Sequence, residues 1–221
     1  MKRRALAVIV FLLFMVVGIY ERESHGDVWK EYQQTGDCGE YKVNYVFAKE
    51  IQEMLDYERD YYSGADVIAE AKMVKETSKQ IRDSMEYVLE IEKVWKGDCE
   101  LEGRQVRYEV IMQCYSGQYK EIYNKFVNFM KPEKRYLVFL YKPNVSYDKN
   151  RVYTSHNFSQ FPYFVIGETD NAFDEEEYEK LEQSNYYKTM EDNEFFVKNQ
   201  EGLNILMKFK QEIMDTYRVE K

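Results

Sequence analysis

The sequence predicts a mainly β protein with flanking helices: a small closed antiparallel barrel of five strands followed by a C-terminal helix. Three observations lead to this fold class. Apolar and polar residues alternate along several segments between residues 67 and 112. Turn residues separate those segments, and stretches with helical apolar spacing precede and follow them. An open α+β sheet with the C-terminal helix across it is the alternative.

The beginning of the chain predicts a targeting segment. Lys2, Arg3 and Arg4 come first, and no charged residue then occurs from Ala5 to Tyr20. A charge is costly inside a bilayer, so such a run is typical of a membrane-inserting segment, and basic residues before it favour an exported remainder. We therefore expect residues 1–26 to be a signal peptide or an N-terminal membrane anchor. Residues 27–221 are expected to form a single globular domain.

The sequence leaves open whether this segment is removed. Sixteen helical residues span roughly 24 Å, short of the ~30 Å hydrocarbon core, which favours a cleaved signal peptide. Small residues suited to cleavage occur in Ser24-His25-Gly26 and in Val16-Val17-Gly18, but neither is an A-x-A site. Cleavage would release the domain outside the cell, and an uncleaved segment would anchor it on the outer face of the membrane.

A helix is the first element expected in the domain, after a polar lead-in at residues 27–45. Its apolar residues share one face, and Ser63-Gly64 is a suitable end. The face consists of Phe47, Ile51, Met54, Leu55 and Tyr62. A second, acidic helix is expected at residues 174–182. The C-terminal helix is predicted from Leu203 to about Tyr217, and its inward face consists of Leu203, Leu206, Met207, Ile213 and Tyr217.

Five strands are expected between these helices. Residues 67–74 are apolar on both faces, which indicates a strand buried on two sides. Residues 85–95 alternate, with Glu86, Glu90 and Glu92 on the face predicted to meet solvent. Residues 106–112 alternate again after a turn at residues 96–98, so the two strands are predicted to form an antiparallel hairpin.

The remaining two strands are an apolar run at residues 136–141, expected to be central, and a short segment at residues 163–166. Short strands with one buried face gain by closing into a barrel, because closure removes unpaired edges. The sequence thus predicts a five-stranded, OB-like barrel whose core covers about residues 65–166.

Several of these segments resemble small exported proteins of Gram-positive bacteria. Residues 65–68 and 71–74 resemble their opening strand, and residues 88–98 resemble their V-E-x-V-x-K-G-D strand and turn. Residues 131–140 resemble their G-E-K-Y-L-L-F-L strand, with Lys131-Pro132 where those proteins usually have Gly. The resemblance covers under half of the chain. It implies export and an OB-like barrel similar to that of metalloproteinase inhibitors and netrin-like modules, and it transfers no functional residues.

Composition excludes some partners and cofactors. The chain has 31 basic and 40 acidic residues and a formal charge of −9, with no basic stripe, so we expect no nucleic-acid binding. Three cysteines, Cys38, Cys99 and Cys114, are too few for a disulfide scaffold, and their pairing stays open. With His25 and His156 as the only histidines, no zinc-site spacing occurs.

No segment carries a catalytic, cofactor-binding or metal-binding motif. Ser155 beside His156 lacks the context of a serine hydrolase, and Cys114 with His156 is an equally unsupported thiol pair. The acidic residues between Glu168 and Glu177 do not follow the calcium-loop spacing. Three aromatic pairs could anchor a partner but are expected to be ordinary packing: Tyr61-Tyr62, Tyr186-Tyr187 and Phe195-Phe196.

The expected function is therefore that of an exported, non-catalytic binding or interaction module at the cell envelope. Its partner would be an unidentified protein or envelope ligand, and it would touch the membrane through residues 1–26 if these are not cleaved. We expect no cofactor. An enzyme with an unrecognised site and a structural envelope protein are the alternatives. A deep pocket with converging polar groups would favour the enzyme.

Overall fold

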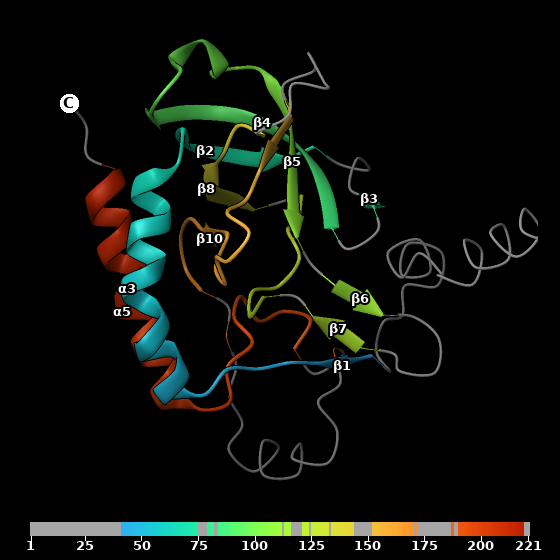
Figure 1. The fold of residues 1–221 in the computed structure, drawn as a ribbon, viewed down its shortest axis with the longest axis vertical. Helices are drawn as coiled ribbons and strands as arrows, with labels where there is room; N and C mark the ends of the chain where they lie inside the picture. Colours follow the sequence, from blue (N-terminus) through green and yellow to red (C-terminus); the bar gives the residue numbers. More distant parts are fainter. Residues whose placement is uncertain are drawn as a thin grey trace, which may run out of the picture.

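The computed structural model describes residues 41–74, 79–81, 84–111, 113–115, 121–123, 125–132, 134–143, 152–169, 171, 187 and 190–218. The predicted signal peptide or anchor and the predicted acidic helix lie outside these ranges. Within them the chain is mainly β, and two α-helices pack beside a curled sheet (Figure 1). Neither of these helices is long and apolar enough to cross a membrane.

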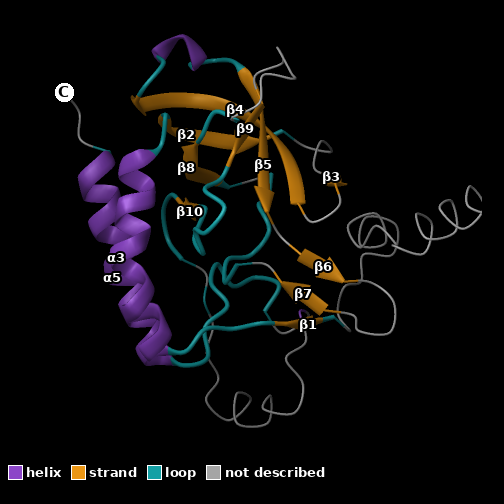
Figure 2. Ribbon diagram, viewed as in Figure 1, coloured by secondary structure: helices purple, strands orange, loops and turns teal. Residues whose placement is uncertain are grey.

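The main sheet has the strand order β10-β8-β2-β4-β5-β9 and curls into a half-barrel (Figure 2). Its neighbours pair antiparallel, apart from β5 and β9, which are parallel. A further short strand, β3, pairs with β4. The strands are β2 (Val67–Met73), β3 (Lys79–Ile81), β4 (Ser84–Lys96), β5 (Gln105–Ile111), β8 (Arg135–Leu140), β9 (Val152–Thr154) and β10 (Tyr163–Val165).

The predicted closed barrel is wrong, although all five predicted strands form. β8 pairs with β2 along one edge and with β10 along the other, so β10 occupies the edge that closure would need. Across the opening, an isolated antiparallel bridge joins Tyr141 to Thr154. A single bridged pair is not a continuous strand pairing and does not close the sheet into a barrel. The OB-like five-stranded barrel, including the one that the resemblance implies, is therefore not formed, and an open sheet describes the fold better.

Predictions for the central strands are confirmed except at one residue. β2 lies between β8 and β4 and is buried on both faces, with Lys72 as its exposed residue. β4 and β5 form the expected antiparallel hairpin. Glu90 and Glu92 are exposed as expected, but Glu86 is buried, because it forms an ion pair with Arg107 of β5.

Both helices are capped by side chains. The backbone N–H of Phe47 donates to the Glu50 carboxylate across 3.0 Å at the start of α3 (Ala48–Gly64), which ends at the predicted glycine. The Asn199 side chain accepts from the Gly202 N–H across 2.9 Å, so α5 (Gln200–Tyr217) begins before the predicted Leu203. Met207, predicted to face inward, is 36% exposed.

The two helices run parallel, side by side (Figure 1). Near their N-termini the helices lie close together. A Cβ added to Gly202 would be only 3.1 Å from the Ile51 side chain. Further along, Arg59 of α3 forms an ion pair with Glu212 of α5 at 2.8 Å. The pair therefore packs as one layer against the sheet.

Aromatic side chains fill the sheet on both faces. On the face toward the helices, Tyr62 of α3 stacks on Phe139 of β8, with ring centroids 3.9 Å apart. Phe164 of β10 packs there against Phe209 of α5. The opposite face is filled by tyrosines of β4, β5, β8 and β10 that are at most 3% exposed: Tyr87, Tyr108, Tyr136 and Tyr163.

A second, small sheet has the order β1-β7-β6 (Figure 1). Its strands are β1 (Lys42–Val43), β7 (Glu121–Tyr123) and β6 (Gln113–Tyr115). Tyr41 and Val43 are buried. The end of the segment predicted as a loose lead-in is therefore part of the folded core.

Candidate functional site

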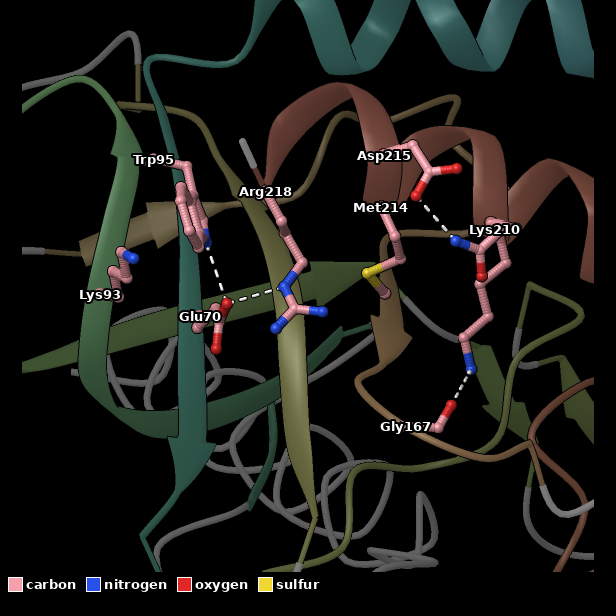
Figure 3. A pocket seen from close by; sticks show the side chains of 9 residues that line it. Glu70, Lys93, Trp95, Gly167, Lys210, Met214, Asp215 and Arg218 are labelled. Atoms are coloured by element: carbon pink, nitrogen blue, oxygen red, sulfur yellow. Dashed lines mark hydrogen bonds and ion pairs between the residues drawn. The ribbon is translucent and has the colours of Figure 1, made fainter. Parts of the chain in front are cut away.

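A groove lies between the C-terminal half of α5 and the strands β2 and β4 (Figure 3). It has a volume of about 820 Å³, within the range of roughly 300–1,000 Å³ that is typical of small-molecule sites. Its walls combine an indole, a thioether and several charged groups. The lining residues are Glu70, Lys93, Trp95, Gly167, Lys210, Gln211, Met214, Asp215 and Arg218.

Helical spacing and strand bulges position these side chains. Lys210 and Met214 are four positions apart and share one stripe of α5, and Arg218, the C-cap residue four positions after Met214, continues that stripe. In β4 the register with β2 shifts, because Ile68 pairs with Lys96 whereas Ala69 pairs with Val94. Trp95 is the extra residue at this shift, and a bulge re-aims its side chain relative to a regular strand.

Glu70 connects the strand wall to the end of α5. It is 5% exposed, and its Oε1 accepts from the Trp95 indole N–H at 3.1 Å and from Arg218 Nε at 2.7 Å. Figure 3 shows Trp95 and Arg218 converging on this carboxylate. On its other side, Arg135 Nη1 lies 3.8 Å from Oε2. A carboxylate on a buried central strand thus orients both an indole and a guanidinium.

The other end of the groove rests on a buried ion pair. Lys210 Nζ lies 2.7 Å from Glu194 Oε2 and also donates to Thr169 Oγ1 at 2.7 Å. Burial raises the pKa of Glu194, while the charge of Lys210 opposes the rise. Glu194 also accepts from the Val165 N–H at 2.9 Å. These contacts tie α5 to the segment after β10.

A second cluster of titratable groups lies at α3, away from the groove. Glu58 is 1% exposed and accepts from Ser159 Oγ at 2.7 Å and from the Gln160 N–H at 2.6 Å. Burial raises the pKa of Glu58, and both hydrogen bonds oppose that rise. Burial likewise lowers the pKa of Lys125 to about 8, although the charge of Glu58 acts in the opposite direction.

Lys125 is held in a strained backbone. Its φ is 44° and that of Phe126 is 57°, a left-handed conformation that side chains with a Cβ rarely adopt. Its Nζ donates to the Asn157 carbonyl at 3.0 Å, with the His156 carbonyl at 3.4 Å. Strain and shifted pKa values are common at functional sites. Here, however, the ammonium and the Glu58 carboxylate are both engaged with the loop at residues 155–160.

His156 belongs to this loop and stacks on Tyr61, with ring centroids 4.0 Å apart. Burial lowers its pKa. Its Nδ1 and the Ser155 hydroxyl are buried, and neither has a hydrogen-bond partner among the described residues. Ser155 and His156 therefore do not form a hydroxyl–imidazole pair. The cluster is better explained as a structural link between this loop and α3 than as a catalytic site.

No protein-family model matches the chain. No curated protein matches it either.

Most of the aromatic pairs singled out in the sequence are core residues. Tyr62 donates to the Phe161 carbonyl at 2.8 Å, and Tyr187 donates to Asn128 Oδ1 at 2.9 Å. Phe195 and Phe196 are fully buried. The packing interpretation is confirmed for these four residues. Tyr186 lies outside the described residues.

The polar candidates give a mixed outcome. The described residues contain no group of three or more His, Cys, Asp or Glu side chains that could hold a metal ion. Cys99 is exposed and has no disulfide partner, whereas the side chain of Cys114 is outside the described set. Most of the acidic stretch from Glu168 to Glu177 is also outside it.

Sequence reasoning missed the groove, although two signals pointed toward it. Glu70 is a charged residue at a buried position of β2, whose other charged residue, Lys72, is exposed, and Lys210 falls on the apolar stripe of α5 between Leu206 and Met214. A charged residue at a position patterned for burial indicates a buried partner. Arg218, the partner of Glu70, is distant from it in the sequence, and Glu194, the partner of Lys210, lies on a segment outside α5. No local periodicity links either pair.

Proposed function

We propose that this protein is an exported, non-catalytic binding module and that the groove between α5 and β2–β4 is its ligand site. Export is supported by the charge-free run from Ala5 to Tyr20 behind three basic residues and by the resemblance to exported Gram-positive proteins. The ligand site is supported by the groove itself, since its size suits a small ligand.

The single observation that carries the binding role is the junction of Glu70, Trp95 and Arg218. Trp95 and Arg218 both donate hydrogen bonds to Glu70, so they are held in place before any ligand arrives. A pre-organised wall loses little conformational entropy on binding, and indole and guanidinium groups are frequent recognition anchors. Converging polar groups are also what an enzyme site needs. Here, however, Glu70 is engaged in orienting Trp95 and Arg218.

Two methionines on α5 allow the site to be tested by NMR. Met214 lines the groove, and Met207 on the same helix is exposed and does not line it. With ¹³C-methyl methionine labels, a fragment library should shift the Met214 resonance and leave the Met207 resonance unchanged. Gln211→Trp, on the rim of the groove, should abolish these shifts, whereas Asn204→Trp, exposed on α5 outside the lining, should preserve them.

Export is tested by expressing the full gene and measuring intact mass after separating cytosol, membrane and medium. A shortened chain in the medium would support a released module, and a full-length chain in the membrane fraction an anchored one. Full-length protein in the cytosol would contradict export.

In the NMR experiment, equal shifts of Met207 and Met214, or none with any fragment, would contradict the groove as a ligand site and would favour the structural alternative.

A further inference from the structure

We propose that the groove binds the oxyanion group of a small acidic ligand, a carboxylate or a phosphate, through the guanidinium of Arg218. This inference rests on the proposed ligand site and adds the chemical class of the ligand. It begins with the hydrogen bonds of Arg218. The Nε atom donates to Glu70, while neither terminal nitrogen has a hydrogen bond or ion pair with a described residue.

The orientation of Arg218 suits such a ligand. A guanidinium presents its two terminal nitrogens as a fork that matches the two oxygens of a carboxylate or phosphate. Glu70 engages the Nε side, so the fork remains available. Because Glu70 also accepts from Trp95 and is 5% exposed, the guanidinium is anchored to a rigid part of the sheet. Figure 3 shows Arg218 extending from the end of α5 toward the groove wall.

The charged residues that line the groove are three cations, Lys93, Lys210 and Arg218, and two carboxylates, Glu70 and Asp215. Arg135 lies 3.8 Å from the second oxygen of Glu70, so it offsets part of the carboxylate charge that faces Arg218. Lys93 Nζ lies 3.8 Å from the centre of the Trp95 ring and adds a further cation to the groove wall. The chain as a whole has a formal charge of −9, so this slight excess of cations in the groove lining is local. Such a region concentrates anions against the general repulsion.

The other walls indicate the rest of the ligand. Trp95 and Met214 present an indole and a thioether to the same space. A planar or apolar body attached to the acidic group would contact these surfaces, because both groups pack well against flat and irregular apolar shapes. The groove volume of about 820 Å³ accommodates a ligand larger than a free anion. An aromatic or aliphatic acid fits this description.

The test compares probes that share one ring and differ in charge: benzoate, phenyl phosphate, benzyl alcohol and benzylamine. Each is titrated while the Met214 and Met207 methyl resonances are followed. Benzoate and phenyl phosphate should shift Met214 in a saturable manner and bind at least about tenfold more tightly than the other two probes, since charge-assisted pairing to arginine is strong. Inorganic phosphate should bind more weakly than phenyl phosphate, because it makes no apolar contact.

Three variants separate the effect of the guanidinium geometry of Arg218 from the effect of its positive charge. Arg218→Gln should weaken benzoate binding at least about tenfold, and Arg218→Lys, which keeps the charge, should recover only part of the loss. Arg104→Gln is the matched control, because Arg104 is exposed and outside the groove, and it should change binding less than about twofold. Unchanged Met207 resonances will show that each variant remains folded.

The outcomes distinguish this inference from the proposed function. Equal or tighter binding of benzyl alcohol or benzylamine at Met214 would overturn the oxyanion assignment and leave the ligand site standing. Absence of binding by every probe and fragment would overturn both. Vesicles of phosphatidylglycerol, with phosphatidylcholine vesicles for comparison, separate a lipid phosphate from a soluble acid. Arg218-dependent binding to phosphatidylglycerol alone would assign the oxyanion to a lipid headgroup.

Discussion

Lys210 Nζ and Glu194 Oε2 lie 2.7 Å apart in an ion pair whose side chains are 6% and 4% exposed. An ion pair buried to this extent gains little over an apolar pair, but either charge alone in the same place is costly. The pair joins α5 to the segment that precedes it, and Glu194 also accepts from the Val165 N–H of β10 and from the Thr169 hydroxyl after β10. It therefore couples the stability of the fold to the integrity of the proposed site.

Lys210→Met is expected to lower the free energy of unfolding by about 3–5 kcal/mol, because it leaves the Glu194 carboxylate buried without its cation. Urea unfolding followed by circular dichroism measures the loss. Adding Glu194→Gln should recover part of it, since the amide oxygen can still accept from Val165. Lys131→Met, which breaks the exposed pair with Asp192, should cost less than about 1 kcal/mol. Equal losses in the two lysine variants would contradict the argument.

Gly97→Ala is expected to destabilise the β4–β5 hairpin by more than about 2 kcal/mol. Gly97 has a φ of +97°, and a Cβ there would lie 2.3 Å from the Asp66 carbonyl oxygen, so the backbone of β2 would have to move. Gly103 is the matched control in the same connection. Its φ is +71°, but a Cβ there would have no neighbouring atom within 4 Å, so Gly103→Ala should cost only about 1 kcal/mol. Thermal unfolding of both variants checks the difference.

Lys125 should make the protein more stable as the pH rises from 8 to 9.5. Burial lowers its pKa to about 8 in the folded state, so the unfolded chain, with the ordinary value of 10.5, binds more protons in this window. Stability therefore increases with pH, by roughly 1.5 kcal/mol over the window. Above it, buried tyrosines act in the opposite direction, because burial raises the pKa of Tyr108 and Tyr163.

The measurement is the pH dependence of the unfolding free energy in the native chain and in Lys125→Met. The variant should lose the increase between pH 8 and 9.5. Lys49→Met provides the control, because Lys49 is exposed on α3, and it should retain the increase. A slope that persists in Lys125→Met would show that another group is responsible.

Asn128→Asp is expected to be among the most destabilising conservative substitutions in the described chain. The two N–H groups of the Asn128 amide are shared among three carbonyl oxygens, those of Met190, Glu191 and Asn193, which lie 2.7–3.2 Å from Nδ2. A carboxylate would place an acceptor against these three acceptors, so we expect a loss of at least about 3 kcal/mol at neutral pH. The loss should shrink at pH 4, where a protonated carboxyl can donate. Asn204→Asp, on the exposed face of α5, should change stability by less than about 0.5 kcal/mol. Chemical unfolding at both pH values tests the pair.

Local patterns in the sequence were sufficient to predict the longer strands and helices of the fold. The five predicted strands, the hairpin of β4 and β5, and the two helices appear near their expected positions, because alternation and helical spacing are properties of neighbouring residues. Short strands without a pattern were missed, such as β9 and the small sheet containing Val43. Their pairing depends on what lies beside them rather than on their own composition.

The sequence by itself determined five of the strands and the two helices and that the chain begins with a charge-free run after basic residues. Only the tertiary structure decided that β10 occupies the edge of β8 and keeps the sheet open. It also decided the groove, because Glu70, Trp95 and Arg218 come from separate elements. Edge pairing and long-range ion pairs depend on the spatial arrangement of distant segments, and no local period in the sequence encodes it.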